Sequence, residues 1–216
     1  MISNIEPTIR GLQAIQVDGL RVTFGDFIAI PGLSFIARYG EIHGIIGPNG
    51  AGKTTLLDVI TGKTRPREGK VILDGRTDLL RLTEPEIALA GVGRKFQKPS
   101  VFEALTVREN LELALRLHQR SILAELRAWG DPRRAARVTE VLEEISLTEK
   151  AKALAGTLAH GQKQWLEIGM LLMQRPKLLM LDEPVAGMTD AETNHTAELV
   201  RRLRDPDRAI LVIEHD

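Results

Sequence analysis

Residues 47–54 carry the side chains and spacing that point most directly to chemistry. They fit G-x-x-x-x-G-K-[ST], the pattern of a phosphate-binding loop. Its glycines let several backbone N–H groups point into one concavity, which suits an anion. Lys53 can then reach the outer phosphates of a nucleotide, and the Thr54 hydroxyl can ligate Mg²⁺. The candidate phosphate-binding residues are Gly47, Pro48, Asn49, Gly50, Ala51, Gly52, Lys53, Thr54 and Thr55.

The segments on either side of this loop supply the setting that it needs. Glu41–Ile46 is an apolar run that predicts a buried strand, and Thr55–Thr61 predicts a helix that ends at Gly62. In a strand–loop–helix unit the N-terminus of the helix adds its dipole to the phosphate site. The alternative is a merely glycine-rich turn, and the flanking pattern speaks against it.

Two adjacent carboxylates, Asp182 and Glu183, follow a second apolar run at Leu178–Leu181. Ligands of open α/β sheets bind at the carboxyl ends of the strands. Neighbouring carboxylates repel each other unless a cation or a proton separates their roles. We therefore expect Asp182 to support Mg²⁺ and Glu183 to orient or deprotonate the attacking water. The alternative is that Asp-Glu-Pro only begins a turn.

Two further segments are ambiguous when they are taken alone. His215 follows an apolar strand predicted at Ala209–Ile213, and it can reach a γ-phosphate if that strand lies beside the one ending at Asp182. A surface histidine is the alternative. The small residues of Leu158–Gln162 open a helix predicted from Lys163 to Met173. They form either a second anion site or an ordinary helix start, and the residues alone favour the ordinary start.

The rest of the pattern predicts an α/β domain with a helical insertion. Residues 1–13 look like an irregular tail, and Ala14–Tyr39 predicts antiparallel strands broken at Gly25–Asp26 and Pro31–Gly32. Strands at 70–75 and 91–96 follow. Residues 99–157 are mostly helical, with a capping box at Thr106–Glu109 and an N-cap with proline at Asp131–Pro132.

After the insertion, apolar strands alternate with helices again, which argues for a parallel sheet. The predicted elements are a helix at 161–174, a strand at 177–181, a helix at 190–204 with a capping box at Thr189–Glu192, and a strand at 209–213.

The helices of the insertion are predicted from two apolar stripes at helical spacing. The first stripe is Val107, Leu111, Ala114 and His118, and the second is Val138, Leu142 and Ile145. The segment Leu123–Trp129 between them is also expected to be helical.

Composition limits the classes of function. The 216 residues contain 29 Lys+Arg and 29 Asp+Glu, so no global basic field favours nucleic acid as a partner. The absence of cysteine excludes disulfides, thiol catalysis and cysteine-based zinc sites. No run approaches the ~18 apolar residues of a membrane span, and residues 1–13 lack the features of a signal peptide. We expect a cytosolic chain whose membrane association comes through a partner.

Taken together, these motifs resemble the ATPase subunit of an ABC transporter in order and spacing, from Phe24 to His215. The resemblance implies a P-loop NTPase fold with a mostly parallel central sheet, an N-terminal antiparallel β subdomain and a helical insertion subdomain. It implies one domain over residues 1–216, in which residues 14–98 and 158–216 form the core and residues 99–157 the helical subdomain.

The same resemblance implies roles for single residues. Phe24 stacks on adenine, Gln97 contacts Mg²⁺ and senses the γ-phosphate, and His215 is the switch histidine. Leu158–Gln162 is the signature motif, which binds the γ-phosphate of ATP held by the opposite subunit. Val185–Thr189 occupies the position of the D-loop. The implied signature residues are Ala159, His160, Gly161 and Gln162, and the implied metal ligands are Thr54, Gln97 and Asp182.

The implied cofactors are ATP and Mg²⁺, and the implied partners are parts of a transporter. They are a second ATPase subunit, which is another copy or a related chain, membrane permease subunits and, indirectly, an extracytoplasmic substrate-binding protein. The chain would lie at the cytoplasmic face of the membrane through the permease. Its head-to-tail dimer would close on ATP and reopen on hydrolysis at Glu183.

A finer likeness concerns the transported substrate. Residues 93–99, 160–167 and 184–190 look like the UrtD-type ATPase of urea importers, a group beside the branched-chain amino acid importers. Urea is therefore the expected substrate, with branched-chain amino acids as the alternative. A non-transport ABC ATPase of DNA repair or translation is less consistent with the chain, because it contains no long coiled coil, zinc module or second cassette.

Two departures from the family pattern carry expectations. Ala159 replaces the usual serine of the signature and lacks its hydroxyl, so we expect a weakened motif in which backbone N–H groups and His160 compensate in part. A non-hydrolysing subunit is a further alternative, and the argument against it is that the chain retains Lys53, Gln97, Glu183 and His215. The sequence stops one residue after His215, and family members continue, so we expect a shortened chain.

The segment Lys98–Phe102 is the candidate site for permease docking. The alternative is that Val101 and Phe102 pack beneath their own helix.

Overall fold

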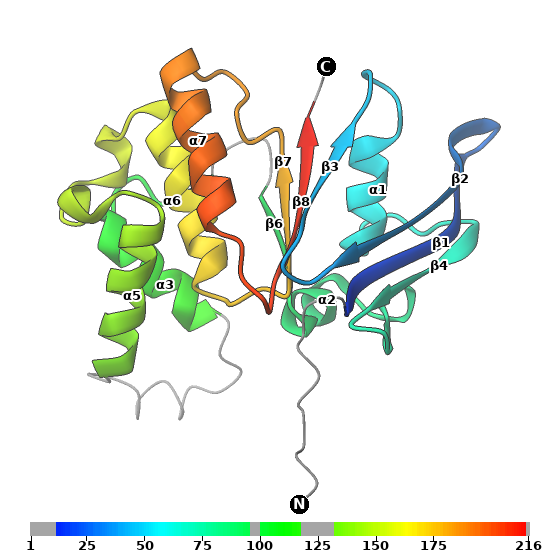
Figure 1. Ribbon diagram of the computed structural model, residues 1–216, viewed down its shortest axis with the longest axis horizontal. Helices are drawn as coiled ribbons and strands as arrows, with labels where there is room; N and C mark the ends of the chain where they lie inside the picture. Colours follow the sequence, from blue (N-terminus) through cyan, green and yellow to red (C-terminus); the bar gives the residue numbers. More distant parts are fainter. Residues whose placement is uncertain (1–11, 96–99, 118–131, 215–216) are drawn as a thin grey trace, which may run out of the picture. The chain divides into compact units, whose positions relative to one another are not determined.

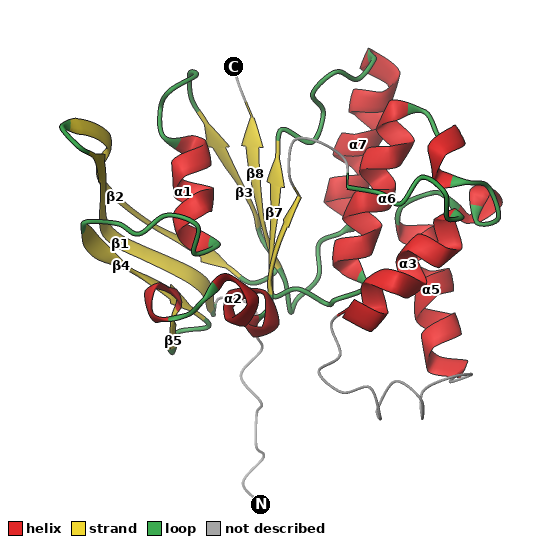
Figure 2. Cartoon of the chain, turned by 180° about the vertical axis from the view of Figure 1, so that it is seen from behind, coloured by secondary structure: helices red, strands yellow, loops and turns green. Residues whose placement is uncertain are grey.

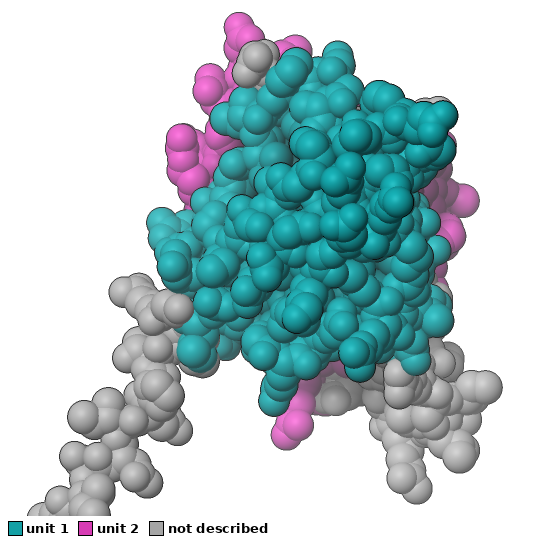
Figure 3. Space-filling view, turned by 90° about the vertical axis from the view of Figure 1, so that its right-hand side faces the viewer, with its two compact units in different colours: residues 1–90, 204–216 teal, residues 91–203 magenta. Residues whose placement is uncertain are grey.

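The computed structural model describes residues 12–95, 100–117 and 132–214. The chain divides into two compact units, one of residues 1–90 with 204–216 and one of residues 91–203 (Figure 3). Each unit is described by itself. The boundaries of the core and the helical subdomain expected from the sequence stay a prediction.

An antiparallel sheet forms much of the first unit (Figure 1). Its strands run in the order β2-β1-β4-β5. Their bounds are β1 (Gln13–Phe24), β2 (Phe27–Arg38), β4 (Glu68–Leu73) and β5 (Thr77–Asp78). Phe24 pairs with Phe27 across the two-residue turn Gly25–Asp26, which confirms the first of the two expected turns.

The second expected turn, at Pro31–Gly32, is wrong, because both residues lie inside β2. Proline lacks the N–H that a central strand must donate to its neighbour, but β2 is an edge strand of its sheet. The β1–β2 pairing is irregular around Leu20 and Val22, close to the partners of this segment. An edge position with an irregular register therefore accommodates a Pro-Gly pair without ending the strand.

The first unit also holds a parallel strand pair and the predicted helix after the phosphate loop. Strand β3 (Ile42–Ile46) pairs in parallel with β8 (Ala209–Glu214). Helix α1 (Lys53–Ile60) follows the loop, and Gly62 just beyond it has a φ of 84°, as a residue that ends a helix often does. A short helix, α2 (Glu84–Ala90), and the 3₁₀ turn η1 (Leu79–Arg81) were not predicted.

The second unit combines a parallel strand pair with helices (Figure 2). Strand β6 (Val92–Lys95) pairs in parallel with β7 (Leu178–Asp182). The helices are α3 (Val107–Leu117), α5 (Pro132–Glu144), α6 (His160–Leu172) and α7 (Asp190–Arg202), with 3₁₀ turns η2 (Thr148–Lys150) and η3 (Ala155–Thr157). Helices α3, α5 and α6 pack on one another.

Local sequence explains where these helices begin. Both capping boxes are present: the backbone N–H groups of Thr106 and Thr189 donate to the carboxylates of Glu109 and Glu192 at 2.7 and 3.0 Å. Pro132 is the first residue of α5, as expected, whereas Asp131, His118 and Leu123–Trp129 lie outside the described residues. Helices α6 and α7 end at Leu172 and Arg202, two residues before the predicted ends.

The expected apolar stripes are buried, and one glycine lets the helices approach closely. A Cβ atom on Gly169 of α6 would lie 2.6 Å from Ile145 and 3.1 Å from Leu111, so any larger residue would force these side chains to move. The buried stripe residues are Val107, Leu111, Ala114, Val138, Leu142 and Ile145. None of the described helices is long and apolar enough to cross a bilayer.

Candidate nucleotide site

The phosphate-binding loop lies between β3 and α1 in the first unit, as predicted, but β3 is not the buried strand that was expected, since none of its residues is buried and Ile46 is 68% exposed. Gly50 and Gly52 have φ values of 80° and 85°, in the left-handed region that favours glycine. A Cβ atom on Gly52 would lie 2.6 Å from the carbonyl oxygen of Ala29, so close backbone packing also demands glycine there. No side chain caps the N-terminus of α1. The loop therefore leads into a helix start that is suited to an anion.

Lys53 is turned toward its own loop. Its Nζ donates to the carbonyl oxygen of Gly47 and, at 3.0 Å, to that of Pro48. The next residue, Thr54, is exposed. The side chain of Lys53 therefore carries a positive charge across the loop where phosphate oxygens would be bound.

Asp182 ends β7 in the second unit and is 2% exposed. Its Oδ2 accepts a hydrogen bond from Nη2 of Arg94 on the neighbouring strand β6, at 3.1 Å. Its Oδ1 is buried and has no hydrogen-bond partner among the described residues. Such an orphaned carboxylate oxygen suits a divalent cation that prefers oxygen ligands.

Glu183 follows with an unusual backbone. Its φ is 49°, one of four positive values among the described residues other than glycine. Its carbonyl oxygen accepts from the N–H of Ala186 at 3.2 Å, so the chain turns sharply directly after the buried strand. Left-handed residues of this kind cost free energy and cluster at functional sites. The geometry therefore supports a functional role for Glu183.

The segment 158–162 begins α6, as expected. Ala159 is the N-cap, and its backbone N–H donates to Oε1 of Gln162 at 3.2 Å. Alanine has no side-chain oxygen to complete a capping box, so this bond is made in one direction only. A Cβ atom on Gly161 would lie 2.9 Å from Oε1 of Glu192, which explains why glycine suits the approach of α7.

Of the other predicted site residues, some are exposed in the structure and some lie outside the described residues. Phe24 is 51% exposed at the end of β1, and its partner Phe27, which the sequence analysis did not single out, is 63% exposed. Phe102 is 47% exposed, so its side chain is not packed away beneath its helix. Gln97 and His215 lie outside the described residues, as do Lys98 and Pro99.

Arg94 and Gln164 are among the residues that contact the predicted ones and that sequence reasoning missed. Arg94 balances the charge of Asp182, and Gln164 contacts the side chain of His160. Arg94 could have been suspected because the predicted strand at 91–96 carries two adjacent basic residues, Arg94 and Lys95. No local pattern distinguishes Gln164 from other polar residues of α6.

Comparison with known proteins decides the family. The family model described as ABC transporter matches residues 30–186. The chain belongs to the ABC transporter family. The high-affinity branched-chain amino acid transport ATP-binding protein BraF of Pseudomonas aeruginosa is 40% identical over 209 residues, covering 94% of this chain and 82% of BraF. LivG of Escherichia coli, which carries the same description, is 38% identical over 211 residues with the same coverage.

Solved structures agree with this assignment. The ADP conformation of MJ1267, an ATP-binding cassette of an ABC transporter, has 32% sequence identity and a TM-score of 0.79, covering 94% of this chain and 82% of that one. This ABC protein is therefore an ATPase with the α/β P-loop fold of its family, and it binds ATP. The expected fold class, with parallel strands, an antiparallel β part and helices, is confirmed.

The named relatives favour one of the two expected substrates. BraF and LivG are described as branched-chain amino acid transport proteins, so they support the alternative that the sequence analysis ranked second. They give no support to urea, the expectation that it ranked first.

Proposed function

We propose that this chain is the ATP-hydrolysing subunit of an ABC importer for branched-chain amino acids. The ATP-binding part of the proposal rests on the loop at 47–54, whose glycines at 50 and 52 have left-handed backbone angles. A helix follows this loop, and the side chain of Lys53 donates to carbonyl oxygens of the loop. The substrate part rests on BraF and LivG.

In this proposal the loop binds the phosphates of ATP through its backbone N–H groups and Lys53. Phe24 stacks on the adenine, for which its exposure on β1 is suitable. Thr54, Gln97 and Asp182 would hold Mg²⁺, which would supply charge neutralisation at the phosphates. The orphaned Oδ1 of Asp182 fits this assignment.

Glu183 has the role of orienting or deprotonating the attacking water, and His215 contacts the γ-phosphate. Arg94 holds Oδ2 of Asp182, so that Oδ1 is the oxygen left for the metal. Because both oxygens of Asp182 are then engaged, Glu183 is the carboxylate left to act on water.

Two ATPase subunits would close head to tail. The signature motif of each subunit would then complete the nucleotide site of the opposite subunit. The dimeric post-hydrolysis structure of MJ0796, bound to ADP and Pi, supports this idea at 25% identity and a TM-score of 0.74. Closure would move permease subunits, for which the exposed Phe102 is a candidate contact. The ATPase would then lie on the cytoplasmic face of the membrane, with an extracytoplasmic binding protein delivering the substrate.

Hydrolysis is tested with Glu183→Gln in the full chain. We expect ATP binding to persist and kcat to fall by at least about a hundredfold, because general base catalysis is removed. Lys53→Ala serves as the comparison, since it should weaken ATP binding itself. Retained hydrolysis in Glu183→Gln would show that another group activates the water.

The substrate is tested by assembling the chain in proteoliposomes with the permease subunits and the extracytoplasmic binding protein of its own transporter. We expect ATP-dependent accumulation of leucine and none of urea. Accumulation of urea alone would restore the other alternative.

A further inference from the structure

The side chain of Gln164 joins the first turn of its own helix, α6, to a loop of the second unit. Gln164 lies on α6 and is 1% exposed. Its Nε2 is 2.9 Å from Nε2 of His160, at the start of α6, and 3.3 Å from the carbonyl oxygen of Ala186, in the loop that follows β7. One buried amide group therefore contacts both the signature segment and the segment at the D-loop position.

The contact with Ala186 determines which end of the amide faces Ala186 and His160. A carbonyl oxygen only accepts hydrogen bonds, so the atom 3.3 Å from it must be the amide nitrogen of Gln164. The flipped amide would place two oxygens against each other and lose this bond. The two hydrogens of Nε2 can then serve Ala186 and His160, one each.

This orientation determines the tautomer of the His160 ring. A ring nitrogen that accepts a hydrogen bond carries no proton, so Nε2 of His160 is unprotonated and the proton of the neutral ring is on Nδ1. The backbone of the neighbouring loop lies against the same edge of the ring, since a Cβ atom on Gly187 would be 3.7 Å from Nε2. His160 itself is exposed, so its remaining N–H can meet a ligand.

We propose that Gln164 is a positioning residue that holds the proton of His160 on Nδ1, so that the signature segment offers an N–H donor where Ala159 offers no hydroxyl. The ligand of this donor is the γ-phosphate of ATP, and in that respect the inference rests on the proposed function. Through Ala186, the same amide ties the donor to the loop that begins at Glu183. The start of α6 and the loop after β7 are thereby linked within one subunit.

The tautomer is measured directly by ¹⁵N NMR of the full chain with labelled histidine, at a pH of about 8.5, where an ordinary histidine is neutral. The chain has 5 histidines, and His160→Gln assigns the signals of His160. We expect Nδ1 to be protonated and Nε2 to be unprotonated. A wild-type spectrum with the proton on Nε2 would overturn the proposal, whatever the ATPase does.

Gln164→Glu keeps the length and shape of the side chain but replaces the amide donor by an acceptor, so the bond to Ala186 is lost as well. A carboxylate accepts from Nε2–H, so we expect the proton of the neutral His160 ring to move to Nε2 in this variant. The matched control is Lys163→Gln on the same turn of α6, which removes the ion pair with Glu103 and should leave the tautomer unchanged. An unchanged tautomer in Gln164→Glu would show that Gln164 does not set it.

Hydrolysis by the same variants tests the functional consequence. We expect Gln164→Glu to lower kcat about tenfold while KM for ATP changes by less than about twofold, because the loop at 47–54 still binds the nucleotide. In a His160→Gly background the same substitution should have a much smaller effect. An equal loss in both backgrounds would overturn the positioning role, whereas a wild type that binds no ATP would overturn the proposed function instead.

Discussion

Nη2 of Arg94 lies 3.1 Å from Oδ2 of Asp182, and the two side chains are 5% and 2% exposed. The pair joins neighbouring parallel strands, β6 and β7, at the end where Glu183 follows. A buried carboxylate of this kind would be costly without its counter-charge. The pair therefore places a counter-charge against Oδ2 of Asp182 inside the protein while leaving Oδ1 for another partner.

Replacing Arg94 by Met should lower the free energy of unfolding by about 3–5 kcal/mol, because it leaves the charge of Asp182 uncompensated. The double variant Arg94→Met/Asp182→Leu should lose less than the single variant, since no charge is then buried. Urea unfolding of both proteins checks this. Equal losses would show that the ion pair contributes through packing alone.

Ala159→Ser should complete the capping box that Gln162 already half forms at the start of α6. We expect the free energy of unfolding to rise by about 1 kcal/mol, and the added hydroxyl should raise ATPase turnover in the assembled transporter. Thermal unfolding and phosphate release measure the two effects. Thr189→Ala, which removes half of the complete box on α7, should cost a similar amount of stability. Unchanged turnover in Ala159→Ser would contradict the idea of a weakened signature.

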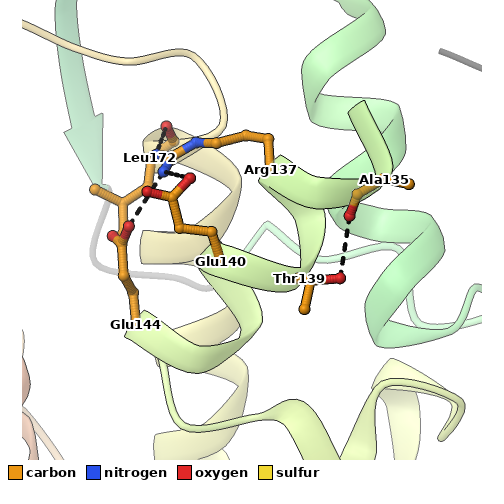
Figure 4. Close-up of polar contacts among 6 residues, drawn as sticks. All are labelled: Ala135, Arg137, Thr139, Glu140, Glu144 and Leu172. Carbon is orange, nitrogen blue, oxygen red and sulfur yellow. Dashed lines mark hydrogen bonds and ion pairs between the residues drawn. The ribbon is translucent and has the colours of Figure 1, made fainter. Parts of the chain in front are cut away.

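Arg137 links helices α5 and α6 through bonds that Figure 4 shows together. Its Nη2 donates to the carbonyl oxygen of Leu172 at 2.9 Å, and Nη1 lies 2.8 and 3.1 Å from the carboxylates of Glu140 and Glu144. The guanidinium therefore caps the C-terminus of α6, where a cation is favourable.

Arg137→Met should lower the free energy of unfolding by about 2 kcal/mol, because the terminal carbonyl of α6 loses a charged donor. The matched control is Thr139→Ala, in the same picture, where an exposed hydroxyl only bonds back to Ala135 of its own helix. That change should be close to neutral. Comparable losses for the two variants in urea unfolding would contradict the linking role of Arg137.

Burial raises the pKa of Glu167 to about 7, although the charge of Lys95 and the backbone N–H of Ser100 act in the opposite direction. The folded state then binds a proton that the unfolded state releases near its ordinary pKa of 4.5. The contribution of this group to stability is thus present at low pH and is lost as the pH rises toward 7.

We expect the free energy of unfolding to fall by roughly 2 kcal/mol between pH 5 and 7.5 through Glu167. Glu167→Gln, which imitates the protonated form and can still accept from Ser100, should remove this part of the slope. Chemical denaturation across the pH range measures both proteins. Parallel pH curves would show that Glu167 does not titrate in this range.

Much of the architecture could be predicted because its signals are local. Capping boxes at Thr106 and Thr189, proline at the start of α5 and the apolar runs of β3, β7 and β8 each act within a few residues. The failure at Pro31–Gly32 has a non-local cause, since only the position of β2 at a sheet edge makes that pair tolerable inside a strand.

The sequence by itself determined the phosphate-binding loop and the two carboxylates, because the chemistry of each needs consecutive residues of particular types. Tertiary structure alone decided what surrounds them. Arg94 meets Asp182 across 88 positions of the chain, and Gln164 meets Ala186 across 22. Such partners are brought together by strand pairing and helix packing, whose register depends on the whole buried surface, and no short pattern records it.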